Sequence, residues 1–139
     1  MAIFLNNKVG FKVATVDLSD HVTAFTLNRQ ADQLEVTAMG DTSHKFVTGL
    51  SADTITVSFL NDTAAGSVLA TLQTAYGTTV AFAAVQDKVA AISATNKLYT
   101  GTILIDSIPD ISGAVADEAM FDITFTCNST TALATTGTW

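Results

Sequence analysis

The chain has 139 residues, enough for one domain with a hydrophobic core, and no linker rich in proline, glycine or charge divides it. Six Lys and Arg stand against 13 Asp and Glu, which gives a net charge of −7. Because affinity for phosphate comes from basic side chains, this balance argues against a nucleic-acid-binding role. The single Cys excludes an internal disulfide.

The low charge content bears on association and on location. Only 14% of the residues are charged and the mean hydropathy is +0.39, yet no apolar run approaches the roughly 18 residues that span a bilayer, so no direct membrane insertion is expected. Residues 1–5 are too short and lack the basic start of a secretion signal, so synthesis for the cytoplasm is the default. Sparse surface charge favours burial against copies of the same chain, although abundant Ala and Thr also explain the hydropathy.

The first third of the chain predicts two hairpins. Residues 11–18 and 21–28 read as strands joined at Ser19-Asp20, and residues 34–38 alternate as a third strand until Gly40-Asp41-Thr42-Ser43 breaks it. The segment 32–53 therefore reads as a long arm, poor in apolar residues. It is either an ordinary surface hairpin or a device for reaching a neighbour.

The middle of the chain predicts a strand, the one convincing helix and a second strand. In residues 54–60 apolar and hydroxyl side chains alternate, as in a half-buried strand. Asp62 is a candidate N-cap and Gly77 a stop signal, which predicts a helix over 62–77. Its predicted core face carries Ala65, Val68, Leu69, Leu72 and Tyr76, with Val68, Leu69 and Leu72 as the packing residues, and residues 78–85 resume an extended pattern.

The last third predicts two more strands. Residues 86–97 are loop-like, residues 98–108 are rich in β-branched side chains and end at Pro109, and residues 119–127 alternate most clearly. Residues 128–139 form a C-terminal tail that we expect to be ordered only where a partner covers it. Six to eight strands with one flanking helix predict an all-β sandwich or partly open barrel in a single domain, 1–139.

A search for chemistry yields no catalytic, cofactor-binding or metal site. The two His lie in different segments, and no metal-ligand spacing, nucleophile elbow or phosphate loop is present. Cys127 shares the parity of the apolar residues in its strand, which favours a buried structural thiol over a reactive one. A cluster of acidic residues near the end of the chain is interpreted as solvated strand ends in preference to a cation site. The cluster consists of Asp106, Asp110, Asp117, Glu118 and Asp122.

Several segments, taken in order, resemble the tail tube proteins of long-tailed bacteriophages. They are Asp17-Leu-Ser-Asp-His-Val-Thr23, Glu35-Val-Thr-Ala-Met-Gly-Asp-Thr42, Phe46-Val-Thr-Gly-Leu50 leading into Ile55-Thr-Val-Ser-Phe59, Tyr99-Thr-Gly-Thr-Ile-Leu-Ile105, Ile111-Ser-Gly113 and Phe121-Asp-Ile-Thr-Phe125. The resemblance covers most of residues 11–127.

The resemblance implies a β-sandwich flanked by one helix, in hexameric rings that stack into a tube through which DNA passes without specific binding. It also implies that the arm reaches the adjacent ring through Met39, Gly40, Asp41, Thr42, Ser43, His44, Lys45 and Phe46. Tape measure, tail terminator and baseplate or initiator proteins are the partners it suggests. The expected location is the virion tail, assembled in the bacterial cytoplasm.

The polar face of residues 120–127 is expected to line the channel, through Asp122, Thr124 and Thr126, although this face could instead lie outside. A channel that passes DNA without holding it should be neutral or acidic, which the net charge satisfies. Another small virion β-domain, such as a head decoration or head-tail joining protein, is the alternative. A carbohydrate-binding sandwich is disfavoured because the eight Phe mostly fall on apolar strand faces.

Overall fold

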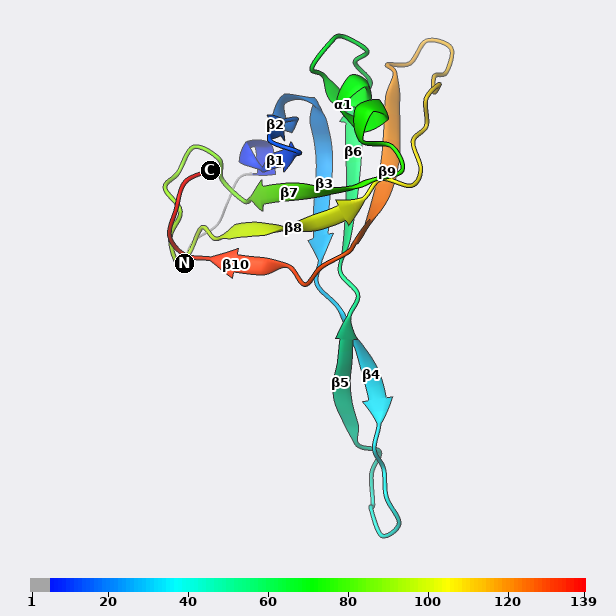
Figure 1. Ribbon diagram of the computed structural model, residues 1–139, viewed down its shortest axis with the longest axis vertical. Helices are drawn as coiled ribbons and strands as arrows, with labels where there is room; N and C mark the ends of the chain where they lie inside the picture. The colour runs from blue at the N-terminus through cyan, green and yellow to red at the C-terminus, as the bar shows by residue number, and fades with distance from the viewer. Residues whose placement is uncertain (1–5) are drawn as a thin grey trace.

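The computed structural model describes residues 6–139, so the interpretation of residues 1–5 as lacking a secretion signal lies outside the described residues. Ten strands, one α-helix and two short 3-10 helices are described (Figure 1). The strands are β1 (Gly10–Val13), β2 (Val16–Asp17), β3 (Val22–Asn28), β4 (Ala31–Glu35), β5 (Phe46–Ser51), β6 (Thr54–Leu60), β7 (Thr79–Val85), β8 (Leu98–Leu104), β9 (Met120–Cys127) and β10 (Ala132–Ala134).

Eight strands form one antiparallel sheet in the order β2-β1-β7-β8-β9-β6-β3, with β10 also paired to β8. Only two residue pairs join β8 to β9, Ile103 with Cys127 and Leu104 with Thr126. At this corner the sheet folds over, so that β3, β6 and β9 cross β7, β8 and β10 at a steep angle (Figure 1). The result is an open, two-layered all-β fold with one flanking helix, which confirms the predicted fold class.

Apolar side chains from both layers meet between them. The rings of Phe11 on β1 and Phe25 on β3 are 5.0 Å apart between centroids, and the rings of Phe59 and Phe121 are 5.5 Å apart. Among the largest fully buried side chains are Phe11, Phe59, Phe125, Leu72 and Ile103. Burial of these aromatic and aliphatic side chains is the main stabilising contribution in a sheet with so little charge.

The predicted first hairpin is wrong. Ala14 and Thr15 have φ of +50° and +73°, and this tight turn folds β2 back onto β1. Ser19 begins a 3-10 helix, Ser19–His21, and its buried hydroxyl accepts a hydrogen bond from the Phe11 amide at 2.9 Å. The next strand, β3, leaves β1 and pairs with β6 instead. Ala-Thr lacks the glycine or asparagine that usually marks such a turn, so no local pattern predicts it.

The helix α1 spans Val68–Ala75, which is shorter than the predicted 62–77. Gly66 has φ +79°, outside helical backbone, and Asp62 holds the preceding loop by accepting hydrogen bonds from the Ala64 amide at 2.9 Å and the Ser67 hydroxyl at 2.7 Å. Asp62 is therefore a loop residue and not the N-cap, which is Ser67. Val68, Leu69 and Leu72 are buried, whereas Ala65 lies outside the helix and Tyr76 is exposed.

Other strand boundaries also differ from those expected. The strand predicted to reach residue 108 ends at Leu104 because β7, its partner, begins only at Thr79, after the turn at Gly77. The strand predicted to reach residue 38 ends at Glu35, where the chain turns into the tip of the arm. The tail is not wholly dependent on a partner, since β10 pairs with β8 within the chain. Cys127 is half-buried rather than buried, because it is the last residue of β9, at the corner of the sheet.

We expect Leu72→Ala to lower the free energy of unfolding by about 2 to 5 kcal/mol, because it leaves a cavity beneath the helix. Thr74→Ala, an exposed substitution on the same helix, should change it by less than about 0.5 kcal/mol. Urea denaturation followed by circular dichroism measures both. Equal effects of the two substitutions would show that α1 does not cover the core through Leu72.

Candidate assembly surfaces

The arm is a separate two-stranded sheet, β4 paired with β5, that projects away from the body along the long axis of the molecule (Figure 1). Its apolar side chains are unusually exposed: Met39 is fully exposed and Leu50 is 80% exposed. The others exposed are Leu34, Val36, Phe46 and Val47. An isolated hairpin is at best marginally stable in water, so such a surface indicates contact with a partner.

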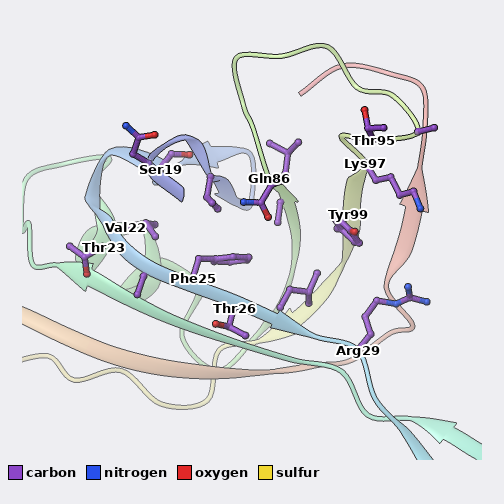
Figure 2. A pocket seen from close by; sticks show the side chains of 17 residues that line it. Ser19, Val22, Thr23, Phe25, Thr26, Arg29, Gln86, Thr95, Lys97 and Tyr99 are labelled. Carbon is purple, nitrogen blue, oxygen red and sulfur yellow. The ribbon is translucent and has the colours of Figure 1, made fainter. Parts of the chain in front are cut away.

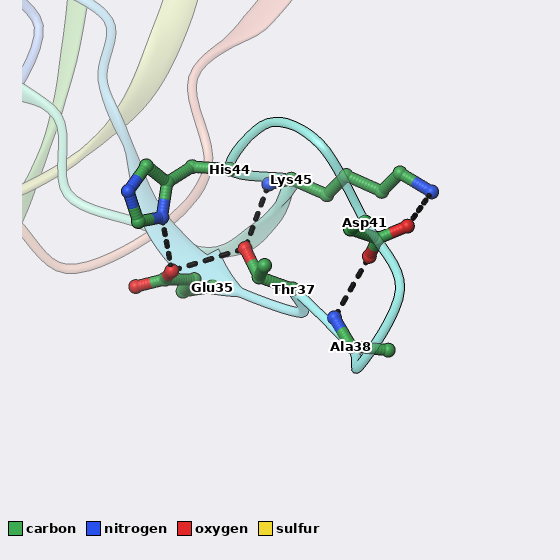
Figure 3. Close-up of polar contacts among 6 residues, drawn as sticks. All are labelled: Glu35, Thr37, Ala38, Asp41, His44 and Lys45. Carbon is green, nitrogen blue, oxygen red and sulfur yellow. Dashed lines mark hydrogen bonds and ion pairs between the residues drawn. The ribbon is translucent and has the colours of Figure 1, made fainter.

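Hydrogen bonds and ion pairs order the tip of the arm (Figure 3). Glu35 Oε1 lies 2.7 Å from His44 Nδ1 and accepts a hydrogen bond from the Thr37 hydroxyl, which in turn accepts one from the Lys45 amide. Asp41 pairs with Lys45 Nζ at 2.7 Å and accepts a hydrogen bond from the Ala38 amide at 2.8 Å, and these contacts hold the pKa of its carboxyl below the usual value. Residues 39–46 thus form a loop whose conformation is held by side-chain contacts.

A buried carboxylate joins the arm to the body. Asp53, 3% exposed, follows β5; its two carboxylate oxygens accept hydrogen bonds from the Gln30 amide at 3.1 Å and the Thr131 amide at 3.0 Å. The Ser51 and Thr130 hydroxyls also lie 2.8 Å apart. Both strands of the arm and the C-terminal tail therefore converge on one side chain. The sequence predicts Asp53 only as the end of the arm, because no local pattern marks a buried carboxylate.

The outer face of β3, β6 and β9 is built from short polar side chains, and we name it the hydroxyl face. The register aligns three rows: Ala24, Ser58 and Asp122; Thr26, Thr56 and Thr124; Asn28, Thr54 and Thr126. Asp122, Thr124 and Thr126 are exposed, and the Ser58 hydroxyl donates to Asp122 Oδ1 at 2.5 Å. These nine residues include no Lys, no Arg and no large apolar side chain. The predicted trio is thus one column of a larger surface.

The fold leaves a groove of about 800 Å³ on its open side, between β3 and the loop that follows β7 (Figure 2). Its walls include Phe25 and Leu27 on β3 and Tyr99 on β8, and among the described residues that line it only Arg29 and Lys97 are charged. The buried Asn96 side chain fixes the loop by donating to the Asp87 carbonyl at 2.9 Å and accepting from the Asp87 amide at 3.1 Å. No sequence pattern predicts this groove, because its walls meet only in the fold.

The side chains that could act in catalysis or metal binding do not gather at one site. Within residues 6–139, no three His, Cys, Asp or Glu side chains are grouped so as to hold a metal ion. Burial, reinforced by the charge of Asp53, raises the pKa of the Cys127 thiol, which disfavours the reactive thiolate. His21 pairs with Asp62 at 3.0 Å, and His44 pairs with Glu35 in the arm, so the two His lie in separate contacts. No helix in the described part of the chain is long and apolar enough to cross a membrane.

Solved structures with the same fold come from phage-like particles. One is a chain of the virion of a native gene transfer agent (GTA) particle, with a TM-score of 0.72, 15% identity, and coverage of 95% of this chain and 99% of that one. Another is a chain of the tail of an empty GTA particle refined with helical, C6 symmetry, with a TM-score of 0.63, 14% identity, and coverage of 82% of each chain. No protein-family model and no curated protein sequence matches the chain. At these identities the likeness shows a shared fold.

Asp53 generates a pH prediction. Burial alone would raise the pKa of its carboxyl, but the hydrogen bonds from Thr131 and Gln30 and the nearby Arg29 hold it below the usual value. A group whose pKa is depressed in the folded state contributes stability above its unfolded pKa, near 3.9, and loses it as the pH falls through the folded pKa. Asp53→Asn should therefore destabilise the protein at pH 7, and the difference from wild type should shrink below about pH 4.

Urea unfolding at a series of pH values measures this difference, and Asp32→Asn, an exposed change in the arm, is the matched control. A difference between wild type and Asp53→Asn that stays constant from pH 7 to pH 3 would contradict the assignment of the charge on Asp53 as the stabilising feature.

Proposed function

We propose that this protein is the structural subunit of a phage-like tail tube, in which six copies form a ring and rings stack around a channel for DNA. The observation that carries the proposal is the two-sided character of the half-sheet β3-β6-β9. One side is core, and the other is the hydroxyl face, a smooth surface without positive charge. The fold shared with chains of GTA virion and tail particles, the latter with C6 symmetry, supports this assignment.

The hydroxyl face suits the wall of a channel for DNA. A duplex carries about one negative charge per 1.7 Å, so a basic wall would bind it at every ring. Short Thr and Ser side chains leave a smooth surface, and the one carboxylate of the hydroxyl face, Asp122, repels phosphate. In this arrangement DNA passes without specific binding, and the opposite layer, with β7, β8 and α1, lies outside.

The arm supplies the contact between rings. It carries its apolar side chains beyond the body of its own subunit, where another copy can cover them. The role is structural, not enzymatic, and the location is the virion tail after assembly in the bacterial cytoplasm. Tape measure, tail terminator and baseplate or initiator proteins are the expected partners of such a tube.

Electron microscopy of the purified protein, with and without tail initiator proteins, tests the proposal. Stacked rings with six-fold symmetry are the expected result. Single rings or monomers that bind only capsids would instead favour a head decoration or head-tail joining protein. Monomers at every concentration in analytical ultracentrifugation would exclude a self-assembling tube.

We expect replacement of residues 40–48 by a short Gly-Ser turn to leave the body folded but to prevent stacking. The segment makes its hydrogen bonds within the arm, so its loss removes the ring contact without opening the core. Circular dichroism checks the fold and electron microscopy counts tubes. Normal tubes from the shortened protein would show that the arm does not join rings.

Asp122→Lys tests the channel wall. Phage with this substitution should build tails of normal length but eject DNA more slowly at low salt, because six lysines per ring would attract phosphate and salt would screen the attraction. Lys8→Glu, a charge change away from the hydroxyl face, is the control, and ejection is followed by fluorescence of a DNA-binding dye. Ejection by the Asp122→Lys phage that is unchanged at every salt concentration would place this face away from the DNA.

A further inference from the structure

The groove beside β3 is open along a strand edge. β3 lies at the end of the sheet order and pairs only with β6, so the backbone N–H and C=O groups along its other edge have no strand partner among residues 6–139. Natural proteins usually protect such an edge, or use it to bind an added strand. The groove that borders it is partly apolar, through Phe25, Leu27 and Tyr99.

The charge in the groove selects an acidic occupant. Arg29 and Lys97 lie at the same end of the groove and are the only charged residues in its lining within 6–139, in a chain whose net charge is −7 (Figure 2). The arm, residues 31–51, carries Asp32, Glu35 and Asp41 against the single cation of Lys45, and so has a net charge of −2. It also carries the exposed apolar side chains that a partly apolar groove can cover.

Length and direction agree with this match. At about 3.3 Å per residue, the seven residues of β3 span about 23 Å, and the ten residues from the base of the arm to its tip span about 33 Å. β3 runs along the same long axis as the arm (Figure 1). A second copy displaced along that axis therefore brings its arm alongside β3, whereas an arm cannot reach its own groove because it projects away from it.

We propose that the groove between β3 and the 86–97 loop is the docking site for the arm of a second copy in the adjacent ring. This inference rests on the proposed function and names the acceptor surface for its ring-to-ring contact. The contact is head-to-tail, a type that continues into a filament rather than closing as a dimer. Strand-edge hydrogen bonds hold the arm, and Arg29 and Lys97 attract its acidic side chains.

A charge reversal in the groove tests the electrostatic part. Lys97 forms no ion pair in the described part of the chain, so Lys97→Glu breaks no ion pair there. It should raise the protein concentration needed for stacking by about tenfold, while single rings still form. Thr74→Glu adds a negative charge at an exposed position on α1, outside the groove, and should leave stacking unchanged. Sedimentation and electron microscopy measure both.

Cysteine cross-linking tests the location. In a Cys127→Ser background, Thr95→Cys places a thiol on the exposed rim of the groove, and Val47→Cys and Thr48→Cys place one on each side of the arm. When a groove variant and an arm variant are mixed, assembled and oxidised, at least one arm variant should form a mixed disulfide, identified by mass spectrometry. Thr124→Cys, on the hydroxyl face, should form none with either arm variant.

Two results would overturn the inference. Tubes without a mixed disulfide from either arm variant, together with normal stacking of Lys97→Glu, would place the arm on another surface and leave the tube function intact. Loss of the rings themselves in Lys97→Glu would assign the groove to a neighbour within the ring. Failure of the wild-type protein to form tubes would count against the proposed function instead, so the two failures are distinguishable.

Discussion

The alternation of side chains along β3, β6 and β9 is the constraint on which the other features depend. Successive side chains of a strand point to opposite sides. Burial of Val57 and Ile123, beside the half-buried Phe25 in the same row, therefore forces Thr26, Thr56 and Thr124 outward in the next. A slip of one residue would exchange core and surface along the whole half-sheet. The hydroxyl face is therefore fixed by the same apolar burial that stabilises the fold, and its uniform composition is what needs a functional explanation.

The arm depends on this half-sheet for its position. It is inserted between β3 and β6, two paired strands, so its two ends are held side by side by the ladder. Asp53 then ties the base of the arm to the C-terminal tail through hydrogen bonds to Gln30 and Thr131. A hairpin that is marginal by itself is thus anchored on a rigid body, which allows it to carry exposed apolar side chains without a core of its own.

The openness of the sheet connects these surfaces. A closed barrel would satisfy every strand edge, but here the 3-10 helix Ser19–His21 carries the chain from β2 to the other layer, and β3 does not pair with β1 or β2. Within residues 6–139, the unpaired edge of β3 lacks backbone hydrogen-bond partners, and the exposed arm carries apolar side chains that no other part of its chain covers. Both are covered if copies of the chain assemble, which also accounts for a surface poor in charge.

The sequence by itself determined the features that rest on local periodicity. The strand Thr54–Leu60 was predicted with its observed bounds, and the strand that ends at Cys127 differs by one residue, because alternation along a half-buried strand is strong and local. The stop at Gly77 follows from its φ of +76°, which glycine adopts without strain. The exposed column Asp122, Thr124 and Thr126 could likewise be read from the alternation alone.

The tertiary structure decided which strands pair and what their pairing brings together. No local pattern marks the turn at Ala14 and Thr15, so β3 was assigned to β1 rather than to β6, its neighbour across the arm. The anchoring of the arm by Asp53 joins residues 78 positions apart in the chain, and the groove likewise brings together Val9, β3 and β8. Periodicity carries no information about such contacts, because it reports which side of an element is buried and not what that side packs against.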